Sequence, residues 1–278
     1  AFLFDVGEGT QRQMMQFGTG FDVDAIFLSH VHGDHVLGLP GLVQTWEFNG
    51  RTDPLVVYTP RGTRRRVVNL IYAITDEPDY PVTVEEVAPG ATVRKRDEYE
   101  IRTIDVEHHT PAVGYALLEA DRKGRFDRER AEELGVPAGP KFSELHGGQP
   151  VELADGTVIE PEQVVGPPRP GRTVVYSGDT RPAETVETAA ERADLLIHDA
   201  TFADEETDRA RETGHSTARE AGRVARHASV NQLVLTHVSP RYAGDTGVLL
   251  QEARDAFDGT VRVAEDGQTI EVPYPDDS

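Results

Sequence analysis

The chain of 278 residues contains no cysteine. This absence excludes disulfide frameworks, thiol nucleophiles, iron–sulfur clusters and cysteine-ligated zinc. Lysine is scarce as well, because only Lys95, Lys123 and Lys141 stand among the 28 basic residues. No apolar run comes near the roughly 20 residues that a membrane-spanning helix needs, and no signal peptide opens the chain. We therefore expect a soluble, cytoplasmic protein without a membrane partner.

The charge balance is strongly acidic, with 49 acidic against 28 basic side chains and a formal net charge of −21. Such a charge repels nucleic acid over most of the surface, which disfavours a nucleic-acid partner. A second interpretation competes, because many acids, few lysines and a low apolar fraction are typical of adaptation to a very salty cytoplasm. At molar salt the Debye length is about 3 Å, so net charge then says little about the ligand.

Short apolar runs alternate with helical patterns, which predicts a mixed α/β architecture. The spacing of Thr217 and Glu220 predicts a capping box at the start of one helix. The helices are expected over residues 10–17, 37–49, 62–74, 182–190, 216–228 and 247–257. The strands are expected over 1–6, 25–29, 55–59, 82–87, 99–106, 113–119, 173–176, 195–199, 232–236, 261–264 and 269–272.

One segment, residues 121–171, interrupts this alternation. It is charged at first and then rich in glycine and proline, with GVPAGP at 135–140 and GPPRPG at 166–171. A stretch of this length without a clear core pattern is usually disordered or a functional protrusion. We interpret it as a flexible arm inserted between two strands of a single domain that covers residues 1–278.

The strongest chemical signal is the string SHVHGDH at residues 29–35, directly after the apolar run 25–28. Alternate side chains of an extended segment point to the same side, so His30 and His32 converge. Gly33 permits a turn, after which Asp34 and His35 face a neighbouring point. Three imidazoles and a carboxylate this close together are the ligands that zinc prefers. The clustering disfavours the alternative of a polar loop with chance histidines.

Further ligand-type side chains stand where other predicted strands end. His108 and His109 follow the strand at 99–106, Asp179 follows the strand at 173–176, and His237 follows the strand at 232–236. Sites in α/β proteins are commonly built at such junctions. A loop turn or a helix cap explains each residue alone equally well, but together they favour a single dinuclear site.

Two more segments carry a second polar group. Asp199 ends an apolar strand, and His215 comes just before the helix at 216–228. A histidine near the site but outside the metal shell is a candidate general acid, and a neighbouring carboxylate fixes its tautomer. Capping of the following helix is an equally good explanation of His215.

The metal motif at 29–35 resembles that of the metallo-β-lactamase superfamily, and the remaining motifs resemble those of its ribonuclease Z family. The motifs that carry this resemblance are FDVGEGTQRQ at 4–13, GDT at 178–180, HDATF at 198–202, GHST at 214–217 and LTHVSPRY at 235–242. The resemblance covers nearly the whole chain. It implies an αββα four-layer sandwich, an arm at 121–171 that clamps tRNA, and a short-form enzyme that acts as a homodimer.

The resemblance also implies two zinc ions per subunit. His108 is preferred over His109 because the family places five residues between this ligand and a Gly-Tyr pair, here Gly114 and Tyr115. His109 stays an alternative. The first ion would be held by His30, His32 and His108, the second by Asp34, His35 and His237, and Asp179 would bridge them.

The reaction implied by the family is removal of the 3′ trailer from precursor tRNA. Hydroxide at the dinuclear site attacks the phosphate, and Asp34 both ligates a metal and accepts the proton of the water. His215, oriented by Asp199, protonates the leaving 3′ oxygen and so leaves a 3′-hydroxyl on the tRNA. The family usually has glutamate where Asp199 stands, which shortens the reach of the carboxylate by about one methylene.

Substrate contacts are expected from arginines and from the arm, since arginine suits bidentate phosphate contacts. A solvent-exposed helix face explains the arginine run at 61–66 equally well. The expected substrate-binding residues are Arg61, Arg64, Arg65, Gly135, Pro137, Gly139, Pro140, Lys141 and Arg241.

The family usually begins with a strand hairpin before the segment that opens this chain at Ala1, and we expect that this hairpin is missing here. Two alternatives of function remain. The first is another hydrolase of this superfamily that acts on small esters or phosphodiesters. The second is a metal-binding partner subunit without catalytic activity.

Overall fold

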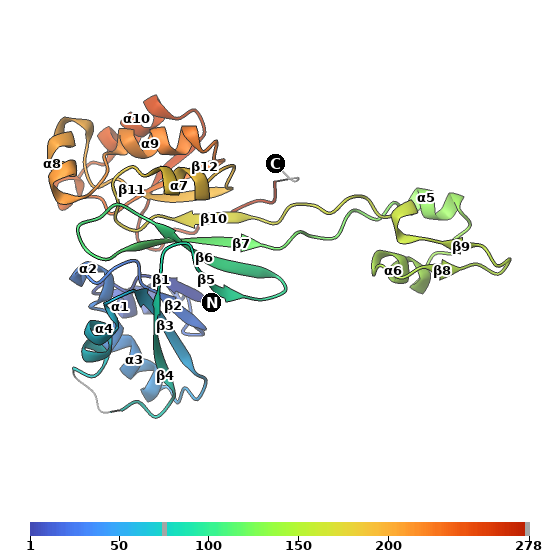
Figure 1. The fold of residues 1–278 in the computed structure, drawn as a ribbon, viewed down its shortest axis with the longest axis horizontal. Helices are drawn as coiled ribbons and strands as arrows, with labels where there is room; N and C mark the ends of the chain where they lie inside the picture. The colour runs from blue at the N-terminus through green and yellow to red at the C-terminus, as the bar shows by residue number, and fades with distance from the viewer. Residues whose placement is uncertain (74–76, 276–278) are drawn as a thin grey trace. The chain divides into compact units, whose positions relative to one another are not determined.

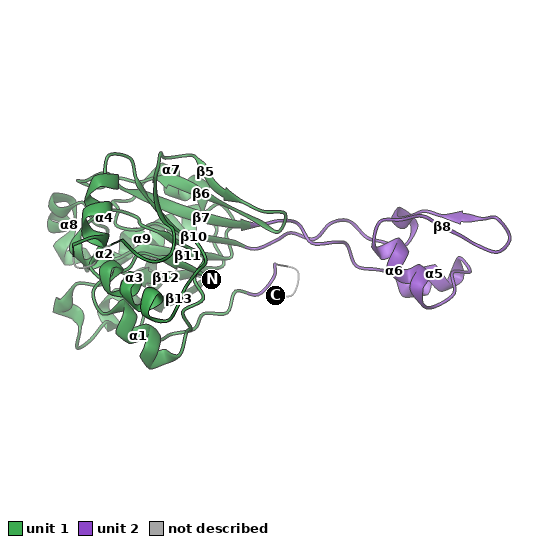
Figure 2. Cartoon of the chain, turned by 90° about the horizontal axis from the view of Figure 1, so that it is seen from below, with its two compact units in different colours: residues 1–118, 173–272 green, residues 119–172, 273–278 purple. Residues whose placement is uncertain are grey.

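The computed structural model describes residues 1–73 and 77–275. Ile74, at the end of the helix expected over 62–74, lies outside the described residues, as do the last three residues of the domain expected over 1–278. The chain divides into two compact units, shown in different colours in Figure 2. The main unit comprises residues 1–118 and 173–272, and the inserted unit comprises 119–172 together with the C-terminal segment from 273.

The main unit begins with a four-stranded sheet in which all the strands are parallel, in the order β1-β2-β3-β4. Apolar side chains from its helices cover one face, with Leu39, Leu42 and Trp46 completely or almost completely buried. The elements are β1 (Phe2–Phe4), α1 (Thr10–Phe17), β2 (Ala25–Phe27), α2 (Gly33–Val36), α3 (Leu39–Phe48), β3 (Leu55–Pro60), α4 (Arg64–Ile71) and β4 (Val82–Val87).

A second sheet of seven strands has the order β13-β12-β11-β10-β7-β6-β5. Strands β10 to β13 are parallel, whereas β10 pairs with β7 in the antiparallel direction. The strands are β5 (Thr92–Lys95), β6 (Tyr99–Asp105), β7 (Val113–Glu119), β10 (Thr173–Tyr176), β11 (Leu195–Asp199), β12 (Gln232–Thr236) and β13 (Thr260–Val263). The helices are α7 (Glu184–Ala189), α8 (Thr207–Thr213), α9 (Ala218–His227) and α10 (Gly247–Ala256), with short 3-10 turns η2 (Asp204–Glu206) and η3 (Pro240–Tyr242).

The two sheets pack face to face through an aromatic layer. Phe27 of the first sheet stacks on Tyr58, and its ring contacts Tyr115 of the second sheet at a centroid distance of 5.4 Å. Helices α7, α9 and α10 pack on the outer face of the second sheet, where small residues such as Ala221 and Ala225 permit close approach. Figure 1 shows the strands between α1–α4 below and α7–α10 above. The αββα sandwich is thereby confirmed.

The predicted elements and the observed ones agree closely in the main unit. The capping box is present, because Thr217 accepts from the backbone N–H of Glu220 and Glu220 accepts from that of Thr217. The first strand is shorter than expected, since the chain leaves the extended conformation at Asp5, whose φ is 58°. The strand expected at 269–272 is wrong, because that segment forms no ladder. Among the described helices, none is both long and apolar enough to cross a membrane.

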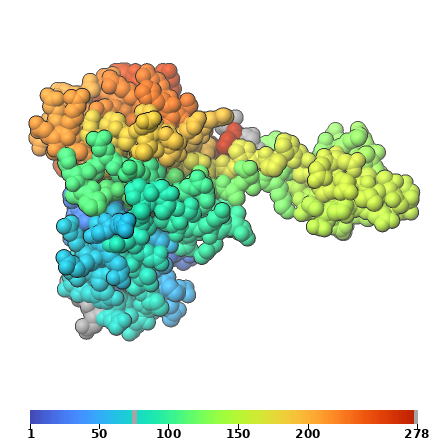
Figure 3. Space-filling model, in the orientation of Figure 1, coloured from blue at the N-terminus to red at the C-terminus, as the bar shows by residue number. Residues whose placement is uncertain are grey.

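The inserted unit has a small core of its own, although its sequence shows no core pattern. Leu145, Ile159 and Val164 are among six buried apolar residues that pack together there. They are spread thinly over the segment among charged, polar, glycine and proline residues, so no helical or strand periodicity reveals them. Its elements are α5 (Arg128–Glu133), α6 (Pro140–His146), β8 (Val151–Glu152), β9 (Val158–Ile159) and the 3-10 turn η1 (Pro161–Gln163), and its surface is light green to yellow in Figure 3.

Candidate metal centre

Polar side chains from the ends of five strands, and from one loop before a helix, come together at one place in the main unit. His30 and His32 follow β2, and the short helix α2 then carries Asp34 and His35. Asp179 follows β10 and His237 follows β12, which lie in the parallel part of the second sheet, so their carboxyl ends share an edge. The remaining members come from the ends of β6 and β11 and from the loop before α9: His108, Asp199 and His215.

The first group of side chains surrounds His30, which is completely buried. The Nε2 atom of His30 lies 2.9 Å from Nδ1 of His32 and 3.5 Å from Oδ2 of Asp179. The ring of His108 lies 5.0 Å from that of His30. One ligand atom from each of His30, His32, His108 and Asp179 lies within 4.8 Å of the others, as a bound metal ion requires.

A second group lies on the other side of Asp179. His35 Nε2 is 3.3 Å from Asp179 Oδ1, and His237 Nε2 is 3.4 Å from Asp179 Oδ2. Asp34 completes the group, with its Oδ2 3.0 Å from His237 Nε2 and 3.5 Å from His35 Nε2. The carboxylate of Asp179 therefore lies between the two groups of ligand-type nitrogen atoms.

The nitrogen of His35 that points away from the ligand cluster is hydrogen-bonded to a carboxylate. His35 Nδ1 donates to Asp5 Oδ2 at 2.7 Å. Asp5 also accepts from the backbone N–H of Ser29, from the Ser29 hydroxyl and from the Tyr176 hydroxyl, at 2.6, 2.7 and 2.6 Å. A single carboxylate thus ties β1, β2 and β10 together behind the ligand cluster. The sequence pattern predicted no role for Asp5 at the site, although Asp5 stands at the end of a strand, as several of the ligand-type residues do.

The hydrogen bonds of three further histidines determine their tautomers. The Ser29 hydroxyl donates to Asp5, so His30 Nδ1 must donate to that hydroxyl, at 3.0 Å. In the same way Thr201 donates to a carboxylate, so His237 Nδ1 donates to the Thr201 hydroxyl at 2.8 Å. His108 Nδ1 donates to the backbone carbonyl of Gly214 at 2.9 Å. In each ring the Nε2 lone pair is left for a metal.

These residues fit a divalent metal ion. Buried ligand-type atoms stand without a hydrogen-bond partner in the described residues, among them His35 Nε2, His108 Nε2 and Asp179 Oδ1. Nitrogen and oxygen donors without sulfur suit zinc and similar borderline metals. His109 does not join them, because its Nε2 donates to the Glu212 carbonyl and its side chain is exposed.

The electrostatics of the two groups differ. Burial lowers the pKa of His30 to about 2, and the neighbouring His35 and His108 act in the same direction, so His30 is a neutral ligand. Burial also acts to lower the pKa of His35, but the nearby carboxylates of Asp179 and Asp5 outweigh it and raise the pKa to about 10. The carboxylates therefore favour positive charge at this point, which a bound cation supplies.

A carboxylate–histidine pair lies beside the metal ligands. His215 Nδ1 donates to Asp199 Oδ2 at 2.8 Å. Asp199 also accepts from the backbone N–H groups of Thr180 and Thr201 and from the Thr201 hydroxyl. Both oxygens of Asp199 therefore accept hydrogen bonds, and one of these bonds orients the ring of His215.

Close approach of two loops makes one glycine necessary. Gly178 has a φ of 60°, and a Cβ there would lie 2.6 Å from the Cβ of Ser29. Any larger residue would separate the loop that carries Asp179 from the loop that carries His30. The GDT motif therefore serves the cluster through its glycine as well as its aspartate.

Comparison with known proteins agrees with this geometry. A family model described as a beta-lactamase superfamily domain matches residues 2–136 and 140–238. The chain is 61% identical to ribonuclease Z of Halobacterium salinarum over 276 residues, which cover 99% of this chain and 89% of that protein. It is 60% identical to ribonuclease Z of Haloferax volcanii over 275 residues, which cover 99% and 86%.

The chain belongs to the ribonuclease Z family. Among solved structures it is similar to human tRNase Z, short form, with a TM-score of 0.68, 25% identity and coverage of 98% of this chain and 88% of that one. The resemblance seen in the motifs is thus confirmed. The relatives from halophilic organisms also confirm that the acidic composition is a halophilic one.

The arginines expected to bind substrate lie in two regions of the main unit. Arg61 and Arg65 are exposed near the start of α4, while Arg64 donates to the backbone carbonyl of Val84. Arg241 lies in η3, four residues after His237, and its guanidinium pairs with Glu206 at 2.5 Å. Arg241 also lies over the ring of Phe202. Both segments follow strand ends.

The expected residues of the glycine–proline loop lie in the inserted unit. Gly135 and Pro137 flank Val136, which is buried in the small core and anchors the loop. Gly139 precedes α6, Pro140 is its first residue, and Lys141 Nζ donates to the backbone carbonyl of Glu152 at 2.5 Å.

Replacement of Asp5 tests the support behind the ligands. Asp5→Asn keeps the size of the side chain but cannot accept from all its buried donors, so His35 loses its fixed orientation. We expect metal affinity, measured by competition with a chromogenic chelator, to fall about 10- to 100-fold. Tyr176→Phe, which removes only one of the donors, is the matched control and should change the affinity much less. Equal affinities of Asp5→Asn and the wild type would contradict this role.

Proposed function

We propose that this chain is a metal-dependent endoribonuclease that removes the 3′ trailer from precursor tRNA and leaves a 3′-hydroxyl. Its membership of the ribonuclease Z family, at about 60% identity over nearly the whole chain, carries this proposal. Human tRNase Z, a structural neighbour, is named for action on tRNA. We place the activity in the cytoplasm, as the cysteine-free composition favours.

The site would hold two zinc ions. Such ions supply Lewis-acid stabilisation of the charge on the phosphate and lower the pKa of a water molecule. Zinc is proposed because all the donors are imidazole nitrogen or carboxylate oxygen, and four rings turn Nε2 toward the centre. The ligands would be His30, His32 and His108 for one ion and Asp34, His35 and His237 for the other, with Asp179 between them.

The protein's own groups move the protons. The oxygen of water forms a bond to phosphorus, and Asp34 accepts the proton that this water loses. The bond from phosphorus to the 3′ oxygen of the tRNA breaks, and His215 gives its proton to that oxygen. Asp199 holds the imidazole in position for this transfer. The products are a tRNA with a 3′-hydroxyl and a trailer with a 5′-phosphate.

His215→Ala separates the proton donor from the metal site. We expect turnover of a 3′-extended precursor tRNA to fall by about 10²- to 10⁴-fold in molar salt, while bound zinc stays unchanged. The wild type should lose its activity in chelator and regain it with zinc. His109→Ala, a neighbouring exposed histidine outside the cluster, is the control and should keep both activity and metal.

Three results would count against this assignment. Loss of zinc in His215→Ala equal to the loss of activity would remove the separate role of His215. A wild type that hydrolyses small esters but not precursor tRNA would favour another hydrolase of the superfamily. A wild type that binds metal and cuts neither substrate would favour a partner subunit without activity.

The inserted unit would bind the tRNA. It carries Arg122, Arg125 and Arg128 among acidic residues, and its glycine–proline loop is held on a small core by Val136. Arginine contacts phosphate oxygens in pairs, which fixes the register of an RNA without reading its sequence. In the main unit, the arginines at 61–65 and Arg241 would contact further phosphates.

Deletion of residues 121–171 tests this binding role. The ends of the deletion lie side by side, because the backbone N–H of Glu119 donates to the carbonyl of Arg172 at 2.9 Å, so an Asn-Gly turn can join them. We expect kcat/KM for precursor tRNA to fall by about 100-fold, or about 2.8 kcal/mol. Hydrolysis of bis(4-nitrophenyl) phosphate should be unchanged, and an equal loss on both substrates would make the unit structural only.

The chain would act as a homodimer through an apolar surface between α1 and α3. Phe48 is 90% exposed and Met15 is 57% exposed, which is unusual in a chain with so few apolar residues. Both line a groove of about 410 Å³ together with Gln11 and Gly41. We propose that a second copy covers this surface.

A charge placed on this surface tests the dimer. Phe48→Asp puts a carboxylate where apolar area would be buried, so the dissociation constant should rise at least about tenfold. Analytical ultracentrifugation in molar salt measures it. Val248→Asp, at another exposed apolar residue on α10, is the control and should leave the dimer intact. An unchanged dissociation constant in Phe48→Asp would show that the dimer interface is not at this surface.

A further inference from the structure

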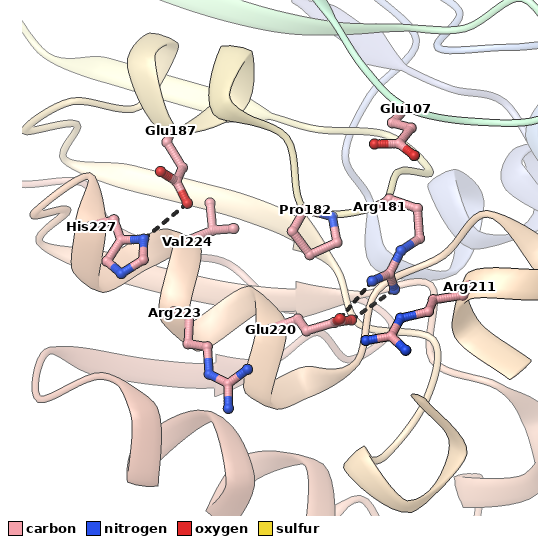
Figure 4. A pocket seen from close by; sticks show the side chains of 9 residues that line it. All are labelled: Glu107, Arg181, Pro182, Glu187, Arg211, Glu220, Arg223, Val224 and His227. Carbon is pink, nitrogen blue, oxygen red and sulfur yellow. Dashed lines mark hydrogen bonds and ion pairs between the residues drawn. The ribbon is translucent and has the colours of Figure 1, made fainter. Parts of the chain in front are cut away.

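A pocket of about 480 Å³ lies between α9 and the loop that follows β10. Figure 4 shows Arg181 reaching across it to Glu220, with Arg211 and Arg223 also on its lining. Arg181 is two residues after Asp179, and its side chain is only 13% exposed. The sequence pattern predicts no role for Arg181, because a lone arginine after the GDT motif has no distinguishing signal.

The guanidinium of Arg181 makes three hydrogen bonds. Its Nη2 donates to Glu220 Oε1 at 2.6 Å, and its Nη1 donates to Glu220 Oε2 at 2.8 Å. Nη1 also donates to the backbone carbonyl of His215 at 2.5 Å. Arg181 is therefore a direct side-chain link between the loop that carries Asp179 and the main chain of the residue that we propose as proton donor.

The partner Glu220 is itself part of the structure that holds His215. Its Oε2 accepts from the backbone N–H of Thr217 at 2.9 Å, which starts α9. Ser216 donates through its hydroxyl to the carbonyl of Thr180 at 2.7 Å. The segment 214–217 is thus attached to the loop after β10 twice, by the Ser216 hydroxyl and by Arg181, which bonds the His215 carbonyl and Glu220.

The same loop is attached to the strand end that carries His108. The backbone N–H of Arg181 donates to the carbonyl of Glu107 at 2.8 Å, and His108 donates to the carbonyl of Gly214. A movement of Arg181 would therefore first displace the backbone of His215. His215 lies next to the ligand cluster, because its Nδ1 is 3.9 Å from Asp179 Oδ2. A small displacement of the His215 ring would therefore change its distance from a phosphate bound at the cluster.

We propose that Arg181 is a positioning residue for the cleavage reaction, which acts by fixing the backbone carbonyl of His215 against the paired carboxylate of Glu220. This inference rests on the proposed function. The planar guanidinium reaches both oxygens of Glu220 and the carbonyl at once, whereas the single ammonium group of lysine does not reproduce this fork. The consequence is specific: loss of Arg181 should impair only the step in which His215 gives its proton.

The experiment compares two substrates in molar salt with zinc-loaded, full-length protein. Arg181→Ala should lower kcat for precursor tRNA by roughly 10- to 100-fold with little change in KM. Hydrolysis of bis(4-nitrophenyl) phosphate should be within about twofold of the wild type, because its leaving group needs no proton. In a His215→Ala background the same substitution should cost less than about twofold, since both changes act on one group.

Two further variants complete the design. Arg223→Ala removes an arginine from the same pocket that makes no contact with His215 in the described structure, and it should leave both rates unchanged. Arg181→Lys keeps the charge next to Glu220 and should show the same selective loss with a smaller magnitude. Thermal unfolding and zinc content show whether Arg181→Ala folds. If it does not fold, Arg181→Lys alone carries the test.

Several outcomes would overturn the inference. Equal losses on both substrates in Arg181→Lys, or loss of zinc, would make Arg181 a structural residue only. Losses that multiply in the double variant with His215→Ala would mean that Arg181 acts independently of that histidine. A wild type that does not cut precursor tRNA would contradict the proposed function and the inference together, whereas an active wild type with an unaffected Arg181→Ala contradicts the inference alone.

Discussion

The hydrogen bonds that four of the ligand-type imidazoles, those of His30, His35, His108 and His237, donate through Nδ1 are the interaction on which the site depends. It fixes which nitrogen carries the proton, and so leaves Nε2 as a lone pair that faces Asp179. The acceptors come from four different sources: the hydroxyls of Ser29 and Thr201, the carboxylate of Asp5 and the carbonyl of Gly214. Because none of these acceptors is itself in the cluster, the chemistry of the site is set by the loops behind it.

The fold explains how those loops come to be adjacent. Parallel strands end at a common edge, so the segments after β10, β11 and β12 meet without long connections. Three residues at the meeting point take left-handed backbone conformations: Asp5, Gly178 and His237, with φ of 58°, 60° and 57°. For the two that carry a Cβ this conformation costs about 1–2 kcal/mol. The buried hydrogen bonds of their side chains offset that cost, which is the usual balance at functional sites.

Sequence reasoning reached the ligand cluster because its signals are local. His30, His32, Asp34 and His35 stand within six residues, and Asp179 and His237 follow apolar runs that are plainly strands. The same reasoning could not find which groups support them. The bond from Tyr176 to Asp5 joins residues 171 positions apart, and such pairs leave no periodic trace in a single sequence. The core of the inserted unit could not be predicted for a similar reason, since its apolar residues are few and are spread thinly among charged, polar, glycine and proline residues.

The acidic composition is compatible with an RNA substrate because salt shortens the distance over which charges interact. At molar salt the screening length is about 3 Å, so the net charge of −21 hardly reaches an approaching phosphate. Only groups in direct contact then matter, and the planar fork of arginine makes two directed bonds where lysine offers a hydrated point charge. The pairs that Arg181 forms with Glu220 and Arg172 with Glu119 show the same two-bond geometry within the protein. All but three of the 28 basic residues in this chain are arginines. The chain therefore retains the two-bond interactions that persist in salt, both for its own stability and for contacts with phosphate oxygens.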